Sequence, residues 1–114
     1  MKLHFDNEEI RQHVIEISKQ YPKLGDRLNL VFTKLKSFDY DDLELHINEE
    51  LHKSAHSQQI KYIPNEKVYE YRIPPHCKYG VLRMNFVVED DRWTVCIKRV
   101  WTKGTKPVSK KERR

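Results

Sequence analysis

The sequence has few of the features that mark membrane-spanning or secreted proteins. No apolar run approaches the roughly 18 residues that a membrane-spanning helix needs, so we expect no membrane partner. The opening residues, MKLHFDNEE, lack the apolar stretch and the small-residue cleavage pattern of a secretory signal. We therefore expect a cytoplasmic protein.

Cysteine is scarce, and its spacing excludes the common metal motifs. Cys77 and Cys96 form no Cys-x-x-Cys pair, and their spacing to the histidines is not of the kind that zinc sites use. Two of the six histidines, His52 and His56, would align with each other only if that segment is helical. We expect reduced thiols, no cofactor and no metal site.

Positive charge is concentrated near one end of the chain. The net charge of the 114 residues is +5, but residues 98–114 carry +7, which leaves −2 for the rest. The eight basic residues of this stretch are Lys98, Arg99, Lys103, Lys106, Lys110, Lys111, Arg113 and Arg114. Such local charge is typical of polyanion binders, because it determines the attraction to phosphates. Over residues 108–114, a solvated tail, which we expect to be mobile, explains the charge equally well.

Two amphipathic helices are predicted in the first third of the chain. Asp6 and Glu9 resemble a capping box that opens the first helix, which ends near Pro22. The second helix begins at Pro22 or at Asp26 and runs to about Ser37. Because the connection is so short, we expect the two helices to lie antiparallel.

Three strands are predicted in the second half of the chain. Val68–Ile73, Val81–Val88 and Thr94–Trp101 are rich in β-forming residues and are separated by short turn-like segments, which favours an antiparallel meander. Residues 38–67 are less regular. Their LELHI segment alternates like a strand, whereas INEELHKSAH could form a helical turn, and we expect an irregular stretch with one or two short elements.

Together these patterns predict a single α+β domain over residues 1–107, followed by a basic tail over residues 108–114. A short N-terminal strand over residues 2–5 and the two-helix hairpin would pack on an antiparallel β-sheet. The helices should cover one face of the sheet, because its apolar side must be shielded from water.

Charged residues alternate onto the other face of the predicted sheet. Glu70 and Arg72 should share that face with Arg83, Asn85 and Lys98, a set of side chains able to bind an anion. The alternative is an ordinary solvated face, on which the carboxylate pairs with the cations for less than about 1 kcal/mol each.

Arg99 interrupts the alternation of the last strand, because it falls on the apolar side together with Trp101. Either a β-bulge resets the register, or the stem of Arg99 packs while its head reaches an edge. Trp101 is then a core or strand-end residue, although an aromatic side chain beside cations can also stack on a nucleobase.

Short motifs within residues 68–112 accompany this succession of elements. The first is Glu-x-Arg-Ile, formed by Glu70, Arg72 and Ile73, and the second is Gly-x-x-Arg, formed by Gly80 and Arg83. The third is an aromatic strand end, Trp101, followed by a stretch that contains Lys103, Thr105, Lys106 and Pro107. With the element order strand, helix, helix, strand, strand, strand, the pattern resembles the RelE/ParE superfamily of bacterial toxins, nearest to its HigB-like branch.

The resemblance implies a small endoribonuclease that cleaves messenger RNA at the ribosome, without metal, and is silenced by a cognate antitoxin protein. On that basis Arg72 and Arg83 would clamp the phosphate. Lys98 and Lys103 would add charge or donate a proton. The remaining candidates are Glu70 as a base, His76 as an acid or base, and Arg99, Trp101, Lys106, Lys110 and Lys111 for RNA binding.

One departure from the family pattern concerns the catalytic group near the C-terminus. Many ribosome-dependent members carry a catalytic Tyr or His there, whereas no residue after Tyr79 of this chain is either one. The alternative to an enzyme is a nonenzymatic or gyrase-directed protein of the same fold that binds nucleic acid.

Overall fold

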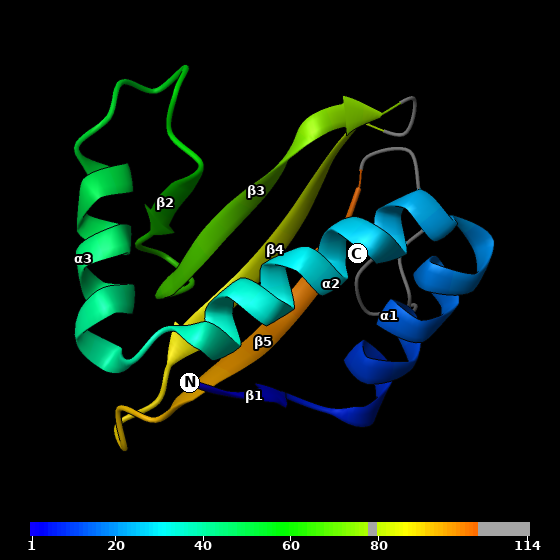
Figure 1. Ribbon diagram of the computed structural model, residues 1–114, viewed down its shortest axis with the longest axis horizontal. Helices are drawn as coiled ribbons and strands as arrows, with labels where there is room; N and C mark the ends of the chain where they lie inside the picture. Colours follow the sequence, from blue (N-terminus) through cyan, green and yellow to red (C-terminus); the bar gives the residue numbers. More distant parts are fainter. Residues whose placement is uncertain (78–79, 103–114) are drawn as a thin grey trace.

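A computed structural model of the protein describes residues 1–77 and 80–102, apart from the side chains of residues 74–81. The elements along the chain are β1 (Lys2–Phe5), α1 (Glu8–Gln20), α2 (Pro22–Ser37), α3 (Tyr40–Leu51), β2 (Ile60–Ile63), β3 (Val68–Cys77), β4 (Gly80–Val88) and β5 (Thr94–Trp101). Within the described residues, three helices thus accompany one five-stranded sheet of order β1-β5-β4-β3-β2 (Figure 1). The predicted α+β class is confirmed.

The sheet is mixed rather than wholly antiparallel. The strands β2, β3, β4 and β5 pair antiparallel in turn, which confirms the predicted meander of the last three. The edge strand β1 pairs parallel with β5, so the prediction of an antiparallel sheet is wrong there. No hairpin joins β1 to β5, and a long connection leaves either direction open to the edge strand.

The start of α1 differs from its predicted capping box. Asn7 is the N-cap, and its side-chain oxygen accepts a hydrogen bond from the Ile10 backbone N–H at 3.0 Å. The predicted capping role of Asp6 is therefore wrong. The Asp6 carboxylate instead accepts a hydrogen bond from the Lys98 Nζ at 3.0 Å, which ties the β1–α1 connection to β5.

The helix α2 starts at Pro22, one of the two predicted positions, and Tyr21 is the only residue between it and α1. The two helices approach closely where Gly25 faces Ser18. A Cβ added to Gly25 would lie 2.9 Å from the Ser18 Cα, which is inside the contact distance of two carbon atoms. A glycine at this position therefore allows the close packing of α1 and α2.

Residues 38–67 are more regular than predicted, because they contain the 12-residue helix α3 and the strand β2. Asp39 caps α3 by accepting a hydrogen bond from the Asp42 N–H at 2.8 Å. Leu43 and Ile47 are buried at helical spacing, whereas Leu45 between them is 60% exposed. That exposed leucine produced the strand-like alternation of LELHI.

All three helices contribute to one core on one face of the sheet, and Figure 1 shows α2 running in front of β4 and β5. The main core residues from the helices are Ile10, Ile17, Leu24, Leu28, Val31, Phe32, Leu35, Leu43 and Ile47, and those from the sheet are Ile60, Tyr71, Ile73, Leu82, Met84, Phe86, Val95, Ile97 and Val100. The opposite face carries most of the polar side chains of β3, β4 and β5, together with Val68, Val87 and Cys96.

Candidate functional site

The sheet face opposite the helices carries two cross-strand rows of mostly polar side chains. Residues paired directly across neighbouring strands share a face, and each row runs from β3 through β4 to β5. We call these residues the arginine face; row by row they are Arg72, Arg83 and Trp101, then Glu70, Asn85 and Arg99. The structure thus brings together five of the predicted site residues and Asn85.

A β-bulge in β5 places Arg99 on this face. Phe86 pairs with Ile97, but the preceding residue Asn85 pairs with Arg99, so Lys98 is an extra residue in β5. Of the two predicted explanations for the position of Arg99, the bulge is confirmed. The sequence alone could not show which residue is the extra one.

Trp101 follows Arg99 onto the arginine face, so the expected placement of both on the apolar side is wrong. Val100 between them takes the core position and is 1% exposed. The Arg99 guanidinium lies 4.2 Å from the centroid of the Trp101 ring, within the range of a cation–π interaction. Together they lie beside Arg83, which is the β4 partner of Trp101.

The pairing of Arg72 with Arg83 sets two guanidinium groups on opposed positions of β3 and β4. Like charges placed directly opposite each other destabilise a sheet. Among the described residues, moreover, no hydrogen-bond partner meets the buried Arg83 Nε or the buried Asn85 Oδ1. An unsatisfied buried polar group costs about 1–3 kcal/mol, and both atoms belong to neighbouring positions of one strand face. Such an arrangement is typical of a site that lacks its ligand.

An anion would satisfy this site. It can accept a hydrogen bond from the Arg83 Nε, and it separates two positive charges that otherwise repel each other. The Asn85 amide can present its N–H groups to the same acceptor after a rotation that exchanges its oxygen and nitrogen. The donors, the charge and the unsatisfied atoms all favour an anion.

Glu70 is the one acid of the arginine face, and it is 7% exposed. Its Oε2 lies 3.4 Å from the Arg72 Nε and 3.4 Å from the Lys61 Nζ. Lys61 comes from β2, where it is paired with Glu70, and sequence reasoning missed it because that strand was not predicted. The only sign of this strand in the sequence was the short alternation of the segment IKYI. A carboxylate shared by two cations positions Arg72, and it can act as a base only if those contacts open.

The strand alternation that predicted Lys98 on the same face as Arg72 and Arg83 is wrong at this residue, because Lys98 is the extra residue of the β5 bulge. Its Nζ donates the 3.0 Å hydrogen bond to Asp6. That hydrogen bond raises the pKa of the Lys98 ammonium. A lysine with a raised pKa releases its proton less readily, so Lys98 is suited to attracting phosphate rather than to acting as a general acid.

Several predicted site residues lie outside the described part of the chain. They are the basic residues Lys103, Lys106, Lys110 and Lys111, together with the predicted tail over residues 108–114. The backbone of His76 belongs to β3, but its side chain is also outside the described residues. The roles of all these residues stay predictions.

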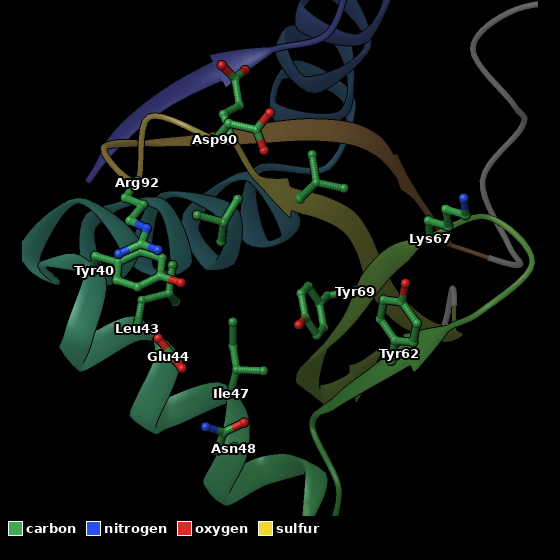
Figure 2. A pocket seen from close by; sticks show the side chains of 13 residues that line it. Tyr40, Leu43, Glu44, Ile47, Asn48, Tyr62, Lys67, Tyr69, Asp90 and Arg92 are labelled. Atoms are coloured by element: carbon green, nitrogen blue, oxygen red, sulfur yellow. The ribbon is translucent and has the colours of Figure 1, made fainter.

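A cavity of about 550 Å³ lies between α3 and the sheet, and its lining includes three tyrosines, three carboxylates and two cations (Figure 2). The Arg92 guanidinium already lies 5.1 Å from the Tyr40 ring centroid. Burial, and then the neighbouring Tyr62, raises the pKa of the Tyr69 hydroxyl. Because acids outnumber cations in this lining, the cavity should repel an anion, and the arginine face is the better candidate for an anion site.

No helix in residues 1–77 and 80–102 combines the length and the apolar character needed to cross a membrane. Comparisons with family models, with curated proteins and with solved structures found no match to the chain. A function for this protein therefore rests on the chemistry of the arginine face and on the RelE/ParE-like sequence pattern.

Proposed function

We propose that the arginine face binds the phosphates of RNA. The observation that carries this proposal is the opposed pair of Arg72 and Arg83, with the buried Arg83 Nε unsatisfied among the described residues. A phosphate between two guanidinium groups turns a repulsive pair into a shared, charge-assisted site. Arg99 stacked on Trp101 extends the cationic surface along the next strand, where a base can stack or a second phosphate can bind.

Taken with the RelE/ParE-like pattern, the site supports a toxin of a toxin–antitoxin system that cleaves messenger RNA at the ribosome. In this reaction the ribose 2′-oxygen attacks the adjacent phosphorus and the bond to the 5′-oxygen breaks. A base takes the 2′ proton, an acid protonates the leaving 5′-oxygen, and the products are a cyclic phosphate and a 5′-hydroxyl. Arg72 and Arg83 would stabilise the charge that develops on the phosphorane.

The proton transfers fall to the remaining site residues in this proposal. A phosphate that binds Arg72 competes with Glu70 for the guanidinium, which would release the carboxylate to accept the 2′ proton. His76 and Lys103 are the candidates for protonating the leaving oxygen. Lys98 adds electrostatic attraction from the bulge of β5.

The second candidate is a nonenzymatic protein with the RelE/ParE-like pattern that binds nucleic acid or is directed at gyrase. Its support is the state of Glu70, which is held by both Lys61 and Arg72 and is the one acid among the six residues of the arginine face. If these contacts persist when RNA binds, the face would hold a phosphate without a base to start cleavage.

Inducible expression in bacteria tests the proposal most directly. We expect the wild-type chain to arrest growth and to fragment messages, and Arg83→Gln to relieve both effects. Arg11→Gln is the matched control, because Arg11 is an exposed arginine of α1 remote from the sheet face. Relief by both variants would show that total charge, rather than the arginine face, causes the arrest.

Binding measurements with purified protein separate the two candidate functions. An enzyme should lose far more cleavage than RNA affinity through Arg83→Gln, whereas a binder loses affinity and any effect on growth together. If the wild-type chain binds RNA but leaves growth and messages intact, the second candidate replaces the first. Absence of RNA binding at low salt would contradict both the enzyme and the RNA-binding form of the second candidate.

The partner that silences the protein in this proposal is an antitoxin with an acidic segment, which would neutralise the arginine face and the basic stretch that follows it. Residues 108–114 contain four cations and one acid. Their deletion should weaken both RNA and antitoxin binding while hardly changing the melting temperature. A large fall in melting temperature would contradict a role confined to binding.

A further inference from the structure

Three potential metal ligands from distant parts of the chain meet beside the edge strand β1. One ligand atom each from His4, Glu89 and Cys96 lies within 4.8 Å of the other two. The parallel pairing of β1 with β5 makes His4 and Cys96 direct cross-strand partners. The turn after β4 brings in Glu89, whose backbone N–H donates to the Thr94 carbonyl at 2.9 Å.

We propose that this cluster is a binding site for a zinc ion. Imidazole nitrogen, thiolate sulfur and carboxylate oxygen are the ligands that zinc takes in proteins, and in a tetrahedral site they lie about 3.5 Å apart. The cluster therefore has to contract by only about 1 Å. His4 is exposed and Glu89 is half-buried, so their side chains can rotate toward the metal, whereas Cys96 is fixed at 3% exposure.

The surroundings of the Cys96 thiol suit a cation. A buried free cysteine usually packs like a small apolar residue, but the Cys96 Sγ lies 3.8 Å from the Asp6 Oδ1 as well as close to Glu89 and His4. When zinc binds, the thiol proton leaves to solvent and the thiolate coordinates the metal. Three protein ligands leave a fourth position for water.

Lys98 sets a limit on the affinity of this site. Its ammonium group binds Asp6 at 3.0 Å, so it places a positive charge near the metal position. The ammonium group and a bound zinc ion would repel each other, although the partly exposed lysine side chain can rotate into solvent. Replacement of Lys98 by a neutral residue should therefore tighten metal binding, which gives the proposal a gain-of-affinity test.

The site lies on the same face of the sheet as the arginine face, but at the other end of β4 and β5 from the Arg72–Arg83 pair. Along β4 and β5, Cys96 pairs with Val87 near the turn, whereas Arg83 pairs with Trp101 at the other end of both strands. A zinc ion would join β1, β5 and the β4–β5 turn, and thereby hold the edge strand in place. Zinc binding and RNA binding can therefore succeed or fail independently.

Cobalt(II) titration of the reduced, metal-free full chain tests the proposal. We expect a thiolate-to-cobalt charge-transfer band that saturates at one equivalent and disappears when zinc is added. Cys96→Ser should abolish the band, and His4→Gln should weaken cobalt binding at least about tenfold. Cys77→Ser is the matched control and should keep the band.

Thermal unfolding provides a second readout that does not depend on colour. Zinc in excess should raise the melting temperature by at least about 5 °C, and His4→Gln, which changes an exposed side chain, should remove that shift while the protein still folds. Lys98→Met should lower the dissociation constant for cobalt several-fold. The proposal is overturned if no band appears, if the band follows Cys77 instead of Cys96, or if zinc stabilises the His4 variant as much as the wild type.

Discussion

Arg83 on β4 is the direct cross-strand partner of Arg72 on β3, and its buried Nε meets no hydrogen-bond acceptor within the described residues. Both features destabilise the free protein. Residues that reduce stability in this way are common in binding sites, where the ligand supplies the missing contact. The relationship leads to a prediction in which stability and binding change in opposite directions.

Arg83→Met should raise the free energy of unfolding by about 1 kcal/mol, because it removes a like-charge pair and an unsatisfied donor. The same change should sharply weaken RNA binding. Urea unfolding and filter binding at one salt concentration measure the two effects, and Arg11→Met should change neither by much. A destabilised variant with wild-type RNA affinity would show that Arg83 is a structural residue.

The salt dependence of RNA binding should report the number of phosphates that the arginine face contacts. Affinity for single-stranded RNA should fall steeply as salt rises, because cation–phosphate contacts release counterions. Arg72→Gln should reduce the slope of log affinity against log salt by about 1, whereas the same change at Arg11 leaves the slope as it was. An unchanged slope for the Arg72 variant would exclude a phosphate contact by this residue.

Glu50 should make stability depend on pH through the connection between α3 and β2. The carboxylate is 3% exposed, and it accepts a hydrogen bond from the Gln59 N–H at 2.9 Å and another from Lys53. Burial alone would raise its pKa, but the hydrogen bonds from Lys53 and Gln59 outweigh burial and lower it. A lowered pKa in the folded state stabilises the protein above the ordinary pKa of glutamate, and this contribution is lost as the pH falls through the folded-state pKa.

Glu50→Gln should therefore cost about 1–3 kcal/mol at neutral pH, and its difference from the wild type should shrink in acid. Urea unfolding at neutral and acidic pH measures this. Glu49→Gln is the control, because Glu49 is the exposed neighbour of Glu50 in the same helix. A difference that stays constant with pH would show that packing, rather than the carboxylate charge, explains the cost.

The two candidate caps of α1 are distinguished by a pair of alanine variants. Asn7→Ala should lower the free energy of unfolding by about 1 kcal/mol, because the Ile10 N–H loses its acceptor. Asp6→Ala removes a partly exposed ion pair with Lys98, which is worth less than about 1 kcal/mol, and a long contact with the Cys96 thiol. A larger effect at Asp6 than at Asn7, measured by thermal unfolding in metal-free buffer, would reverse this assignment.

The local patterns of the sequence were sufficient for the elements whose apolar spacing is regular. α1, α2 and the three-strand meander could be predicted because each depends on nearest neighbours along the chain. α3 could not, since the exposed Leu45 imitates strand alternation. The shared face of Arg72 and Arg83 could also be predicted, because strand alternation determines it.

The remaining site features depend on contacts between distant residues. The bulge at Lys98 moves Arg99 to the arginine face, and the sequence showed only that the alternation was interrupted there. Lys61 reaches Glu70 from a strand that was not predicted. The meeting of His4 with Cys96 requires the parallel β1–β5 pairing, which no local signal encodes.

That parallel pairing also has a consequence for how the chain assembles. β1 precedes every other described element, yet its hydrogen-bonding neighbour β5 is the last of them, so β1 has no strand to join until nearly all the described chain is available. Contacts between residues so far apart in sequence form slowly, because the chain must first close a long loop. Until β1 docks, the edge of β5 is bare and can pair with a strand of another molecule. The yield of refolding should therefore be highest in dilute solution, where a chain meets its own β1 before it meets a neighbour.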